Sequence, residues 1–477
     1  MHGDGQLPEN VDVCTYLEAL PDDQNGTARK AQIRTWLDLG PDSALRFWLA
    51  VERRGGFKVG DWNFVADHSE ILRVLTDRDG VFSVREYGRR MRATSGRFFL
   101  GLDEPEHSRD SPSGAIIPGW NHPNSRQTVA DVAGVREVAA SAALKVLASI
   151  GLRARLARTG DEVQPAELPL ALLVSSVLDA CCERVFGVPG PSALSLNRWA
   201  RDITNYHFRV QADDGVDGSR ALIASSQYRA HINQLIAALA DPALPAPPAD
   251  ASEYARAAYA QRTRQRDTLR RAVAVIRAQL APDGGRPIDD DEVARNLTGI
   301  ITGSLTATTK AFIDGLTIYA RNSSDYSGRL HWPAGAETTE PSGCPHARVF
   351  PQYDAILAQT LSAARRGSPD AIYRTYVGES PCTVGALAVQ RGELVIVWLG
   401  GVLQHDRDYL FGIGGHSCPG RDMGKAIVEG ILRALTQLRG AKAPRLIAAG
   451  DATRLVFEDP ETLTSLPATP ATQRRSS

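Results

Sequence analysis

The segment "FGIGGHSCPG", Phe411 to Gly420, contains four glycines, one histidine and one cysteine in ten residues. Its first three glycines allow the backbone to turn tightly and to approach a flat partner closely, and Pro419 stiffens the exit. Gly420 opens a predicted helix, "RDMGKAIVEGILRALTQL", so Cys418 is expected at a helix N-terminus. The partial positive charge and free N–H groups at such a terminus stabilise a thiolate, which is the form of cysteine that binds a metal.

The cysteine spacing argues against a multi-cysteine metal site. The six cysteines of the chain form no CxxC pair and no zinc-site spacing. Cys181 and Cys182 lie in the apolar run "LPLALLVSSVLDACCERVFGVPG", which predicts buried positions on a core helix. A single thiolate without protein partner ligands is suited to be the axial ligand of a haem iron.

Composition limits the possible partners. The chain has 477 residues, of which 43% are hydrophobic, and a formal net charge of -1. A chain of this length can bury a large core. Its net charge is too small to attract nucleic acid or an anionic membrane to the protein as a whole. The start, "MHGDGQLPENVDVCTYLEAL", has neither a basic region nor an apolar run, so we expect no signal peptide and no membrane anchor. These features predict a cytoplasmic protein that acts on a small molecule.

Apolar periodicity predicts a mainly helical chain with strands near both ends. The segment from Phe57 to Phe64 is expected to be a strand that leads into a helix, and "GALAVQRGELVIVWLGG" predicts a hairpin with Arg391 and Gly392 at its turn. The Pro/Ala-rich tract Asp241 to Ser252 is expected to be a loop between helices, and "TSLPATPATQRRSS" a disordered tail. The long predicted helices are Leu168 to Phe186, Ser219 to Ala240, Glu253 to Leu280 and Asp290 to Arg321.

The glycine-rich loop, Phe411-Gly412-x-Gly414-x-His416-x-Cys418-x-Gly420, resembles the haem-binding signature of the cytochrome P-450 family, in its soluble bacterial type. The resemblance implies a cytochrome P-450 fold, mainly α with small β-sheets, with haem b (iron protoporphyrin IX) between the long I helix and the Cys-loop/L helix. It makes Cys418 the iron ligand and Phe411, Gly414 and Gly420 haem contacts. It also implies one domain over residues 31–462, an extension at 1–30 and a disordered tail at 463–477.

Three further residues are implied to hold the haem propionates. "FLGLDEPEHSRD" resembles the family segment whose histidine contacts a propionate, which corresponds to His107. "AIYRTYV" resembles the strand whose arginine pairs with a propionate, which corresponds to Arg374, and His416 of the loop is the third contact. Two buried carboxylates require charged or hydrogen-bonding partners to offset their desolvation.

The chain departs from the family pattern in its K helix and meander. "LSAARRGSPDAIYR" has Ser362 in the position of the glutamate of Glu-x-x-Arg and keeps Arg365, so the family's ion pair is missing. "GGVLQHDRDYLFGIGG" shortens the meander that normally supplies the third member of this triad.

The I helix departs as well. "DDDEVARNLTGIITG" resembles the start of that helix, and an ungapped alignment puts Thr306 and Ala307 on the acid and threonine that deliver protons to oxygen in the family. A one-residue shift would make Thr306 the relay alcohol and leave Leu305 in the acid's place. The acid is missing in either register. The remaining hydroxyls of this region are Thr302, Ser304, Thr306 and Thr308.

Three functions are compatible with this pattern. The first is a haem-thiolate monooxygenase that oxidises a small organic molecule of bacterial secondary metabolism with O2 and electrons from a separate ferredoxin and reductase, because too little chain follows Cys418 for a reductase domain. The second is a peroxide-dependent or redox-neutral haem-thiolate enzyme that catalyses rearrangement, dehydration or coupling. The third is a non-catalytic relative that acts as a protein partner, which the complete cysteine loop disfavours.

By the same resemblance, four segments line the substrate pocket. They are mixed apolar and polar, which points to a medium-sized, partly polar substrate. The segments are Arg85 to Phe99, Arg201 to Ser226, Ile300 to Thr308 and the residues after Arg374.

Overall fold

The computed structural model divides the chain into two compact units. The first contains Met1–Ser111, Asp202–Ile223 and Leu361–Cys418, and the second contains Pro112–Arg201, Ala224–Thr360 and Pro419–Ser477. The residues described by the structure are 12–38, 41–110, 117, 132–158, 163–209, 212–242, 245–248, 250–281, 287–323, 330, 371–400, 413, 416–438, 443–448 and 453–466.

The first unit is built on a five-stranded sheet in the order β1-β2-β8-β5-β3. β2 and β8 are parallel, and the other neighbouring strands are antiparallel. One cluster of buried apolar side chains joins this sheet to α4, with Ile71, Phe82 and Val397 among its members. The strands are β1 (Phe57–Val59), β2 (Trp62–Val65), β3 (Phe82–Ser83), β5 (Ala371–Tyr376) and β8 (Leu394–Trp398).

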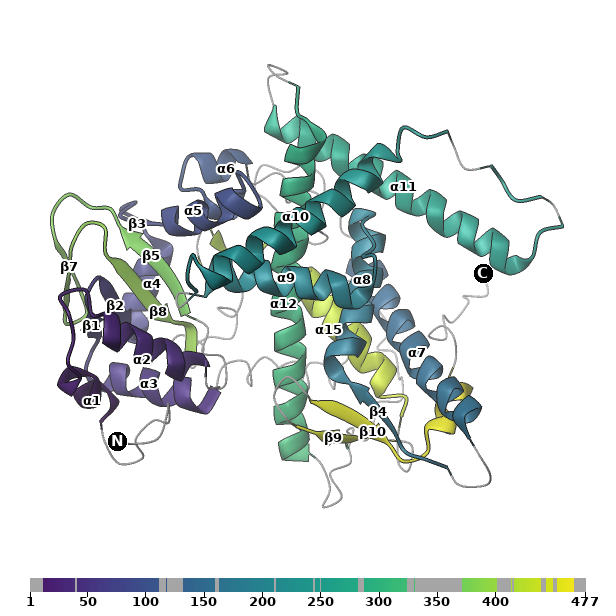
Figure 1. Ribbon diagram of the computed structural model, residues 1–477, viewed down its shortest axis with the longest axis horizontal. Helices are drawn as coiled ribbons and strands as arrows, with labels where there is room; N and C mark the ends of the chain where they lie inside the picture. The colour runs from purple at the N-terminus through teal and green to yellow at the C-terminus, as the bar shows by residue number, and fades with distance from the viewer. Residues whose placement is uncertain are drawn as a thin grey trace, which may run out of the picture. The chain divides into compact units, whose positions relative to one another are not determined.

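Short helices complete the first unit, and Figure 1 shows α2 and α3 beside its strands. Asp67 caps the start of α4 by accepting a hydrogen bond from the Glu70 N–H at 3.0 Å, and Asp77 ends this helix in the left-handed conformation. The helices are α1 (Val13–Ala19), α2 (Thr27–Asp38), α3 (Pro41–Arg53), α4 (His68–Thr76), α5 (Arg85–Thr94), η1 (Phe99–Gly101) and α6 (Glu106–Asp110).

The second unit is a helical bundle in which α7, α8 and α15 lie side by side (Figure 1). Gly430 of α15 packs so closely on α7 that an added Cβ would meet the Ala139 Cβ at 2.6 Å, so a glycine is required there. The helices are α7 (Val132–Ala157), α8 (Leu170–Phe186), α11 (Glu253–Leu280), α12 (Asp290–Ser323), α15 (Arg421–Leu435) and η6 (Pro460–Ser465). A small sheet has the order β4-β10-β9, from Ala166–Pro169, Arg454–Phe457 and Arg445–Ile447.

Two helices contribute residues to both units. α9 (Ala193–Phe208) and α10 (Val216–Ala237) belong mainly to the second unit, but the corner that joins them is grouped with the first. We call residues 202–223 the α9–α10 corner. Backbone carbonyls and side chains of this corner contact α5 and β5.

Most of the predicted elements are confirmed. The strand expected from Phe57 leads through β1 and β2 into α4, and α11 has its predicted bounds. Cys181 and Cys182 are fully buried on α8. The mainly helical content with small sheets agrees with the predicted fold class. Among the described residues, no helix is both long and apolar enough to cross a membrane.

The predicted hairpin around Arg391 and Gly392 is wrong in its pairing. The turn exists, with Gly392 at φ +93°, but the strands on its two sides belong to different sheets. β7 (Leu387–Val389) pairs with β6 (Cys382–Val384) around Gly385 at φ +59°, whereas β8 pairs with β2 and β5. Sequence alternation identifies the strands, but not their partners.

Buried residues lie near both predicted boundaries of the domain, at 30 and at 462. η6 continues to Ser465, and Leu463 within it is fully buried. The extension predicted at 1–30 contains α1, whose Cys14 and Leu17 are also fully buried. The domain boundaries themselves stay a prediction.

Candidate functional site

Cys418 is the exposed cysteine of the described residues. It precedes Gly420, the N-cap of α15, by two positions, as predicted. Burial raises the pKa of the Cys14 and Cys181 thiols to about 12, and that of Cys182 well above its ordinary value. A thiol whose pKa is raised by burial in an apolar core resists deprotonation, whereas the exposed Cys418 is accessible to an incoming metal. The predicted contacts Phe411 and Gly414 lie outside the described residues, as do Ser362 and Arg365.

The structure brings together the three residues predicted to hold propionates. His107 and His416 lie with their ring centroids 4.1 Å apart. Arg374 is close enough that its charge, together with His107, adds to the effect of burial in lowering the pKa of His416 to about 3. Segments that are hundreds of residues apart thus meet in the first unit, which also contains Cys418.

Each histidine of this group is held differently. Nδ1 of the buried His107 donates to the carbonyl oxygen of Phe99 at 2.8 Å, which fixes the orientation of its ring. Nδ1 of His416 is buried and has no hydrogen-bond partner among the described residues. A buried ring nitrogen without a partner is costly, and a bound acceptor would satisfy it.

Arg374 is a buried cation without an ion pair in the described part of the chain. It lies within β5 opposite Val395, and its side chain is only 5% exposed. Its Nη1 donates to the carbonyl oxygen of Tyr373 at 3.0 Å, and its guanidinium carbon lies 5.8 Å from the ring centroid of Tyr87. Burial lowers the pKa of Arg374, which reflects the cost of holding this charge away from water. The group formed by His107, Arg374 and His416 therefore fits an anionic ligand such as the haem carboxylates.

On α12, Thr306 differs from the other hydroxyl residues of its turn. Ser304, Thr308 and Thr309 each donate to a carbonyl oxygen of the preceding turn, at 2.8, 2.6 and 2.9 Å. The Thr306 hydroxyl is buried and has no partner among the described residues. Within α12 it is a hydroxyl that remains available for an outside group.

The other predicted α12 residues have contrasting environments. Thr302 is buried, Ala307 is exposed and Leu305 is 1% exposed. No acid lies between Ile300 and Lys310, so the missing relay acid is not replaced from within this stretch of helix. α12 packs on α15, where Gly424 faces the Thr308 hydroxyl. The relay roles of Thr302, Thr306 and Ala307 stay predictions.

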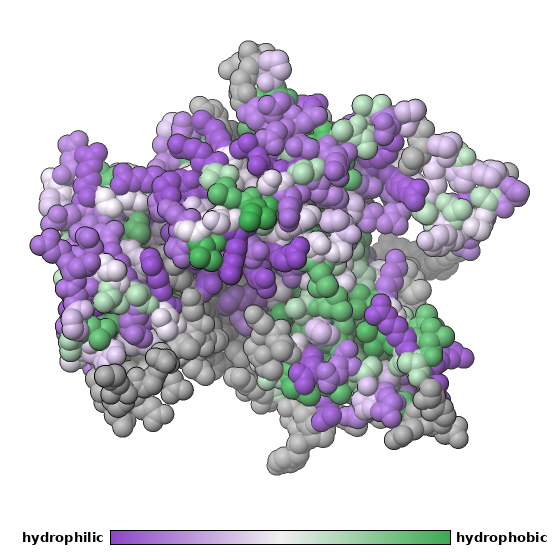
Figure 2. Space-filling model, viewed as in Figure 1, coloured by the Kyte–Doolittle hydropathy of each residue, from purple (hydrophilic) through white to green (hydrophobic). Residues whose placement is uncertain are grey.

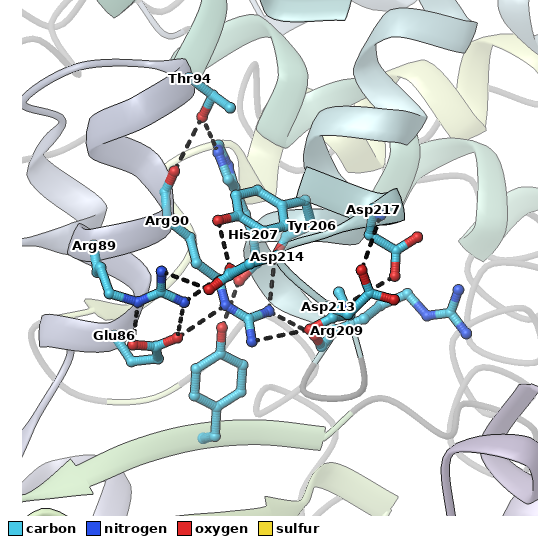
Figure 3. Close-up of polar contacts among 12 residues, drawn as sticks. Glu86, Arg89, Arg90, Thr94, Tyr206, His207, Arg209, Asp213, Asp214 and Asp217 are labelled. Carbon is cyan, nitrogen blue, oxygen red and sulfur yellow. Dashed lines mark hydrogen bonds and ion pairs between the residues drawn. The ribbon is translucent and has the colours of Figure 1, made fainter. Parts of the chain in front are cut away.

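Sequence reasoning missed a buried polar cluster between α5 and the α9–α10 corner (Figure 3). Arg90 is at its centre, at 6% exposure, and His207 is 2% exposed. In the sequence, this region was indicated only by the assignment of Arg85 to Phe99 and Arg201 to Ser226 to the wall of the substrate pocket. Arginine is usually exposed on a helix, so the sequence gives no signal of the burial of Arg90.

Comparisons with known proteins identify the fold. No family model matches the sequence, and no curated protein matches it. Solved structures do match. That of P450BioI in complex with hexadec-9Z-enoic acid ligated acyl carrier protein has a TM-score of 0.53 at 11% identity, over 86% of this chain and 97% of that one. CalO2 has a TM-score of 0.53 at 14% identity, over 87% and 95% of the two chains. A mutant of P450 EryK in complex with erythromycin B has a TM-score of 0.52 at 16% identity, over 91% and 98%.

Proposed function

The chain has the cytochrome P-450 fold, and from this premise we propose that it is a haem-thiolate oxidoreductase with Cys418 as the iron ligand. The observation that carries the proposal is the group of His107, Arg374 and His416, which presents positive charge and an unsatisfied ring nitrogen in the same unit as an exposed cysteine. Arg374 and the two histidines would hold the carboxylates of haem b. Phe411, Gly414 and Gly420 would complete the loop around it.

The bound haem would supply the iron at which an oxidant is activated. The protein's part is then to hold the cofactor, exclude water and move protons. The hydroxyl of Thr306 can orient a water molecule, but an alcohol is far too weak an acid to be a proton source at neutral pH. The hydroxyl of Thr302 lies one turn earlier on α12, and the Ala307 side chain has no exchangeable proton to donate. Protons would therefore arrive through water or from a polar group of the substrate.

We propose a monooxygenase reaction on a small organic molecule of bacterial secondary metabolism. Electrons would come from a separate ferredoxin and reductase, in the cytoplasm. EryK bound to erythromycin B and P450BioI bound to an acylated carrier protein are examples of what this fold accommodates. The mixed apolar and polar character of the predicted pocket segments supports a medium-sized substrate that carries some polar groups.

A second function is favoured by one feature of α12. The stretch from Gly303 to Lys310 contains no Asp or Glu, so it has no acidic side chain that could deliver protons to reduced oxygen. Peroxide brings its own protons and oxidising equivalents, so it could also drive a coupling, and a redox-neutral rearrangement or dehydration needs no such relay. Turnover with added peroxide but not with a ferredoxin system would favour this alternative.

The test of the iron ligand is the spectrum of the reduced, carbon monoxide-bound protein. We expect the strongly red-shifted Soret band of thiolate ligation in the wild type and its loss in Cys418→Ala. Cys382→Ala is the matched control, since Cys382 is a partly buried cysteine of the same unit and should leave the band unchanged. A wild-type band typical of histidine ligation would overturn the proposal.

A further inference from the structure

α11 buries side chains on one face, and only in its second half. In that half the helix packs on α8 and α12, and its buried residues are Thr268, Leu269, Ala272, Val273 and Ile276. The first half of this 28-residue helix contains no buried residue. Its N-terminal end extends past α8 in Figure 1, and in Figure 2 the same end projects without a strongly hydrophobic patch. The helix therefore presents a long outer face to solvent.

The outer face of α11 has charged residues toward both ends and small residues at its centre. Residues spaced three and four positions apart lie on the same side of a helix. On the side opposite the buried face, these positions are Glu253, Arg256, Ala260, Thr263, Asp267 and Arg270. The four charged side chains are exposed. The two small side chains between them would allow a second helix to approach closely, because the distance between helix axes depends on the side chains at the contact.

The order of these residues along the helix is self-complementary. If two copies of α11 lie antiparallel with their outer faces together, Ala260 of one copy can lie opposite Thr263 of the other. In the same register Arg256 lies opposite Asp267 of the other copy, and each such pair occurs twice because of the two-fold symmetry.

The end of the face fits the same register. Glu253 of one copy lies opposite Arg270 of the other, again with opposite charges. A parallel pair would instead place each charged residue against the identical residue of the second copy, so that only like charges would meet. The charge pattern therefore favours an antiparallel arrangement and disfavours a parallel one.

Contacts within the chain leave this face accessible. α8 and α12 lie against the opposite side of α11, so they do not cover the outer face. Asp267 pairs with Arg270 of its own helix at 2.8 Å, but the side chains are 65% and 55% exposed. Such an exposed pair contributes little, and a carboxylate has acceptor capacity for a second arginine.

We propose that the outer face of α11 is a docking surface for a second copy of this chain, in an antiparallel two-fold contact centred on Ala260 and Thr263. The contact runs from Glu253 to Arg270, which is about 26 Å of helix. Because it is small and contains few apolar groups, the dimer is weak, with a dissociation constant on the order of 10–100 µM, and it is sensitive to salt. The proposal does not depend on haem or on the reaction.

Sedimentation velocity of the full-length protein measures the association. In about 50 mM salt the wild type should shift from monomer to dimer as its concentration rises to about 200 µM, and about 300 mM salt should weaken the dimer. A wild type that stays monomeric over this range in low salt would overturn the proposal.

Two charge reversals test the register. Arg256→Glu and Asp267→Arg each place like charges at two symmetry-related points of the homodimer, so each should raise the dissociation constant at least about tenfold. A mixture of the two variants should associate again, because Glu at 256 then meets Arg at 267 and the unchanged Asp267 meets the unchanged Arg256. Recovery in the mixture cannot result from a folding defect of either variant. Two variants that are monomeric alone and also when mixed would contradict this pairing.

Arg262→Glu is the matched control. Arg262 is an exposed arginine of the same half of α11, but it lies off the outer face, and its reversal changes the net charge as much as Arg256→Glu does. It should change the dissociation constant less than about threefold. Equal effects of Arg256→Glu and Arg262→Glu, or a dimer that neither reversal on the outer face weakens, would place the contact elsewhere and overturn the proposal.

Discussion

Two buried arginines of the first unit, Arg90 and Arg374, lie against the same pair of tyrosines but have different partners. The rings of Tyr87 and Tyr373 are 4.1 Å apart, with Arg90 5.5 Å from the Tyr373 centroid and Arg374 5.8 Å from that of Tyr87. The guanidinium of Arg90 donates hydrogen bonds to the Glu86 carboxylate and to three backbone carbonyl oxygens. That of Arg374 donates to the carbonyl oxygen of the adjacent Tyr373 and forms no ion pair in the described part of the chain.

The difference separates a structural cation from a binding cation. A buried charge that is fully hydrogen-bonded within the protein holds the fold, and its removal leaves unpaired groups behind. A buried charge without a protein counter-ion is maintained for a ligand, or else the desolvation cost has no compensation. Substitution of Arg90 should therefore change mainly the stability of the protein, and substitution of Arg374 mainly its haem binding.

Arg90→Met should cause the largest loss of stability. It removes the donor of three buried carbonyls and leaves Glu86 with Arg89 alone, and removal of one partner of a buried pair costs about 3–5 kcal/mol. Arg89→Met is the exposed control and should cost at most about 1 kcal/mol. Urea unfolding of the purified proteins measures both values. Similar losses in the two variants would remove the distinction between buried and exposed cations.

Arg374→Met should affect haem binding more than folding. Loss of one charge-assisted contact corresponds to about 1.5–3 kcal/mol, so haem affinity should fall by about 10–150-fold. Transfer of haem to excess apomyoglobin measures the dissociation rate. Arg391→Met, an exposed arginine on the turn before β8, is the matched control. Unchanged haem loss in Arg374→Met would mean that the propionates bind elsewhere.

Residues of short motifs could be proposed for the site from the sequence, and their roles stay predictions. Cys418, His416, His107 and Arg374 were each identified from local patterns, and the structure brings the last three together. Strand partners and hydrogen-bond partners that are far apart in the sequence could not be predicted from it. β8 pairs with β2 and β5 instead of its sequence neighbour β7, and the carbonyls bound by Arg90 lie more than a hundred residues further along the chain. Such choices depend on packing of the whole unit.

His207 and His416 extend the comparison to histidines. Burial, with a smaller effect of Arg90, lowers the pKa of His207 to about 3 from its ordinary value of 6.5. As the pH falls below 6.5 the unfolded chain binds this proton while the folded protein does not. The free energy of unfolding is therefore not reduced by His207 above pH 6.5. It falls as the pH decreases from 6.5 toward 3, by about 2 kcal/mol at pH 5.

This pH dependence should be weaker in His207→Gln, which cannot take up the proton. The free energy of unfolding at pH 7 and pH 5 measures the difference between wild type and variant. His416 has a similarly lowered pKa in the protein alone, but an anion bound beside it would raise that pKa, so haem should reduce its contribution. An identical decline in wild type and His207→Gln would show that His207 does not titrate in this range.

The smallest change in stability is expected at Thr306. On α12, the Thr306 hydroxyl has no hydrogen-bond partner in the described chain, whereas the Thr308 hydroxyl has one. Thr306→Val removes a buried hydroxyl without a partner in the described chain, so unfolding stability should be unchanged or rise by up to about 1 kcal/mol. Thr308→Val removes a bond to the Ser304 carbonyl and should cost about 0.5–1.5 kcal/mol. If the Thr306 hydroxyl holds a water for proton delivery, Thr306→Val should also release a larger share of reduced oxygen as peroxide, whereas Thr308→Val should not. Equal peroxide release by both variants would exclude Thr306 from the relay and leave it a helix residue of no special role.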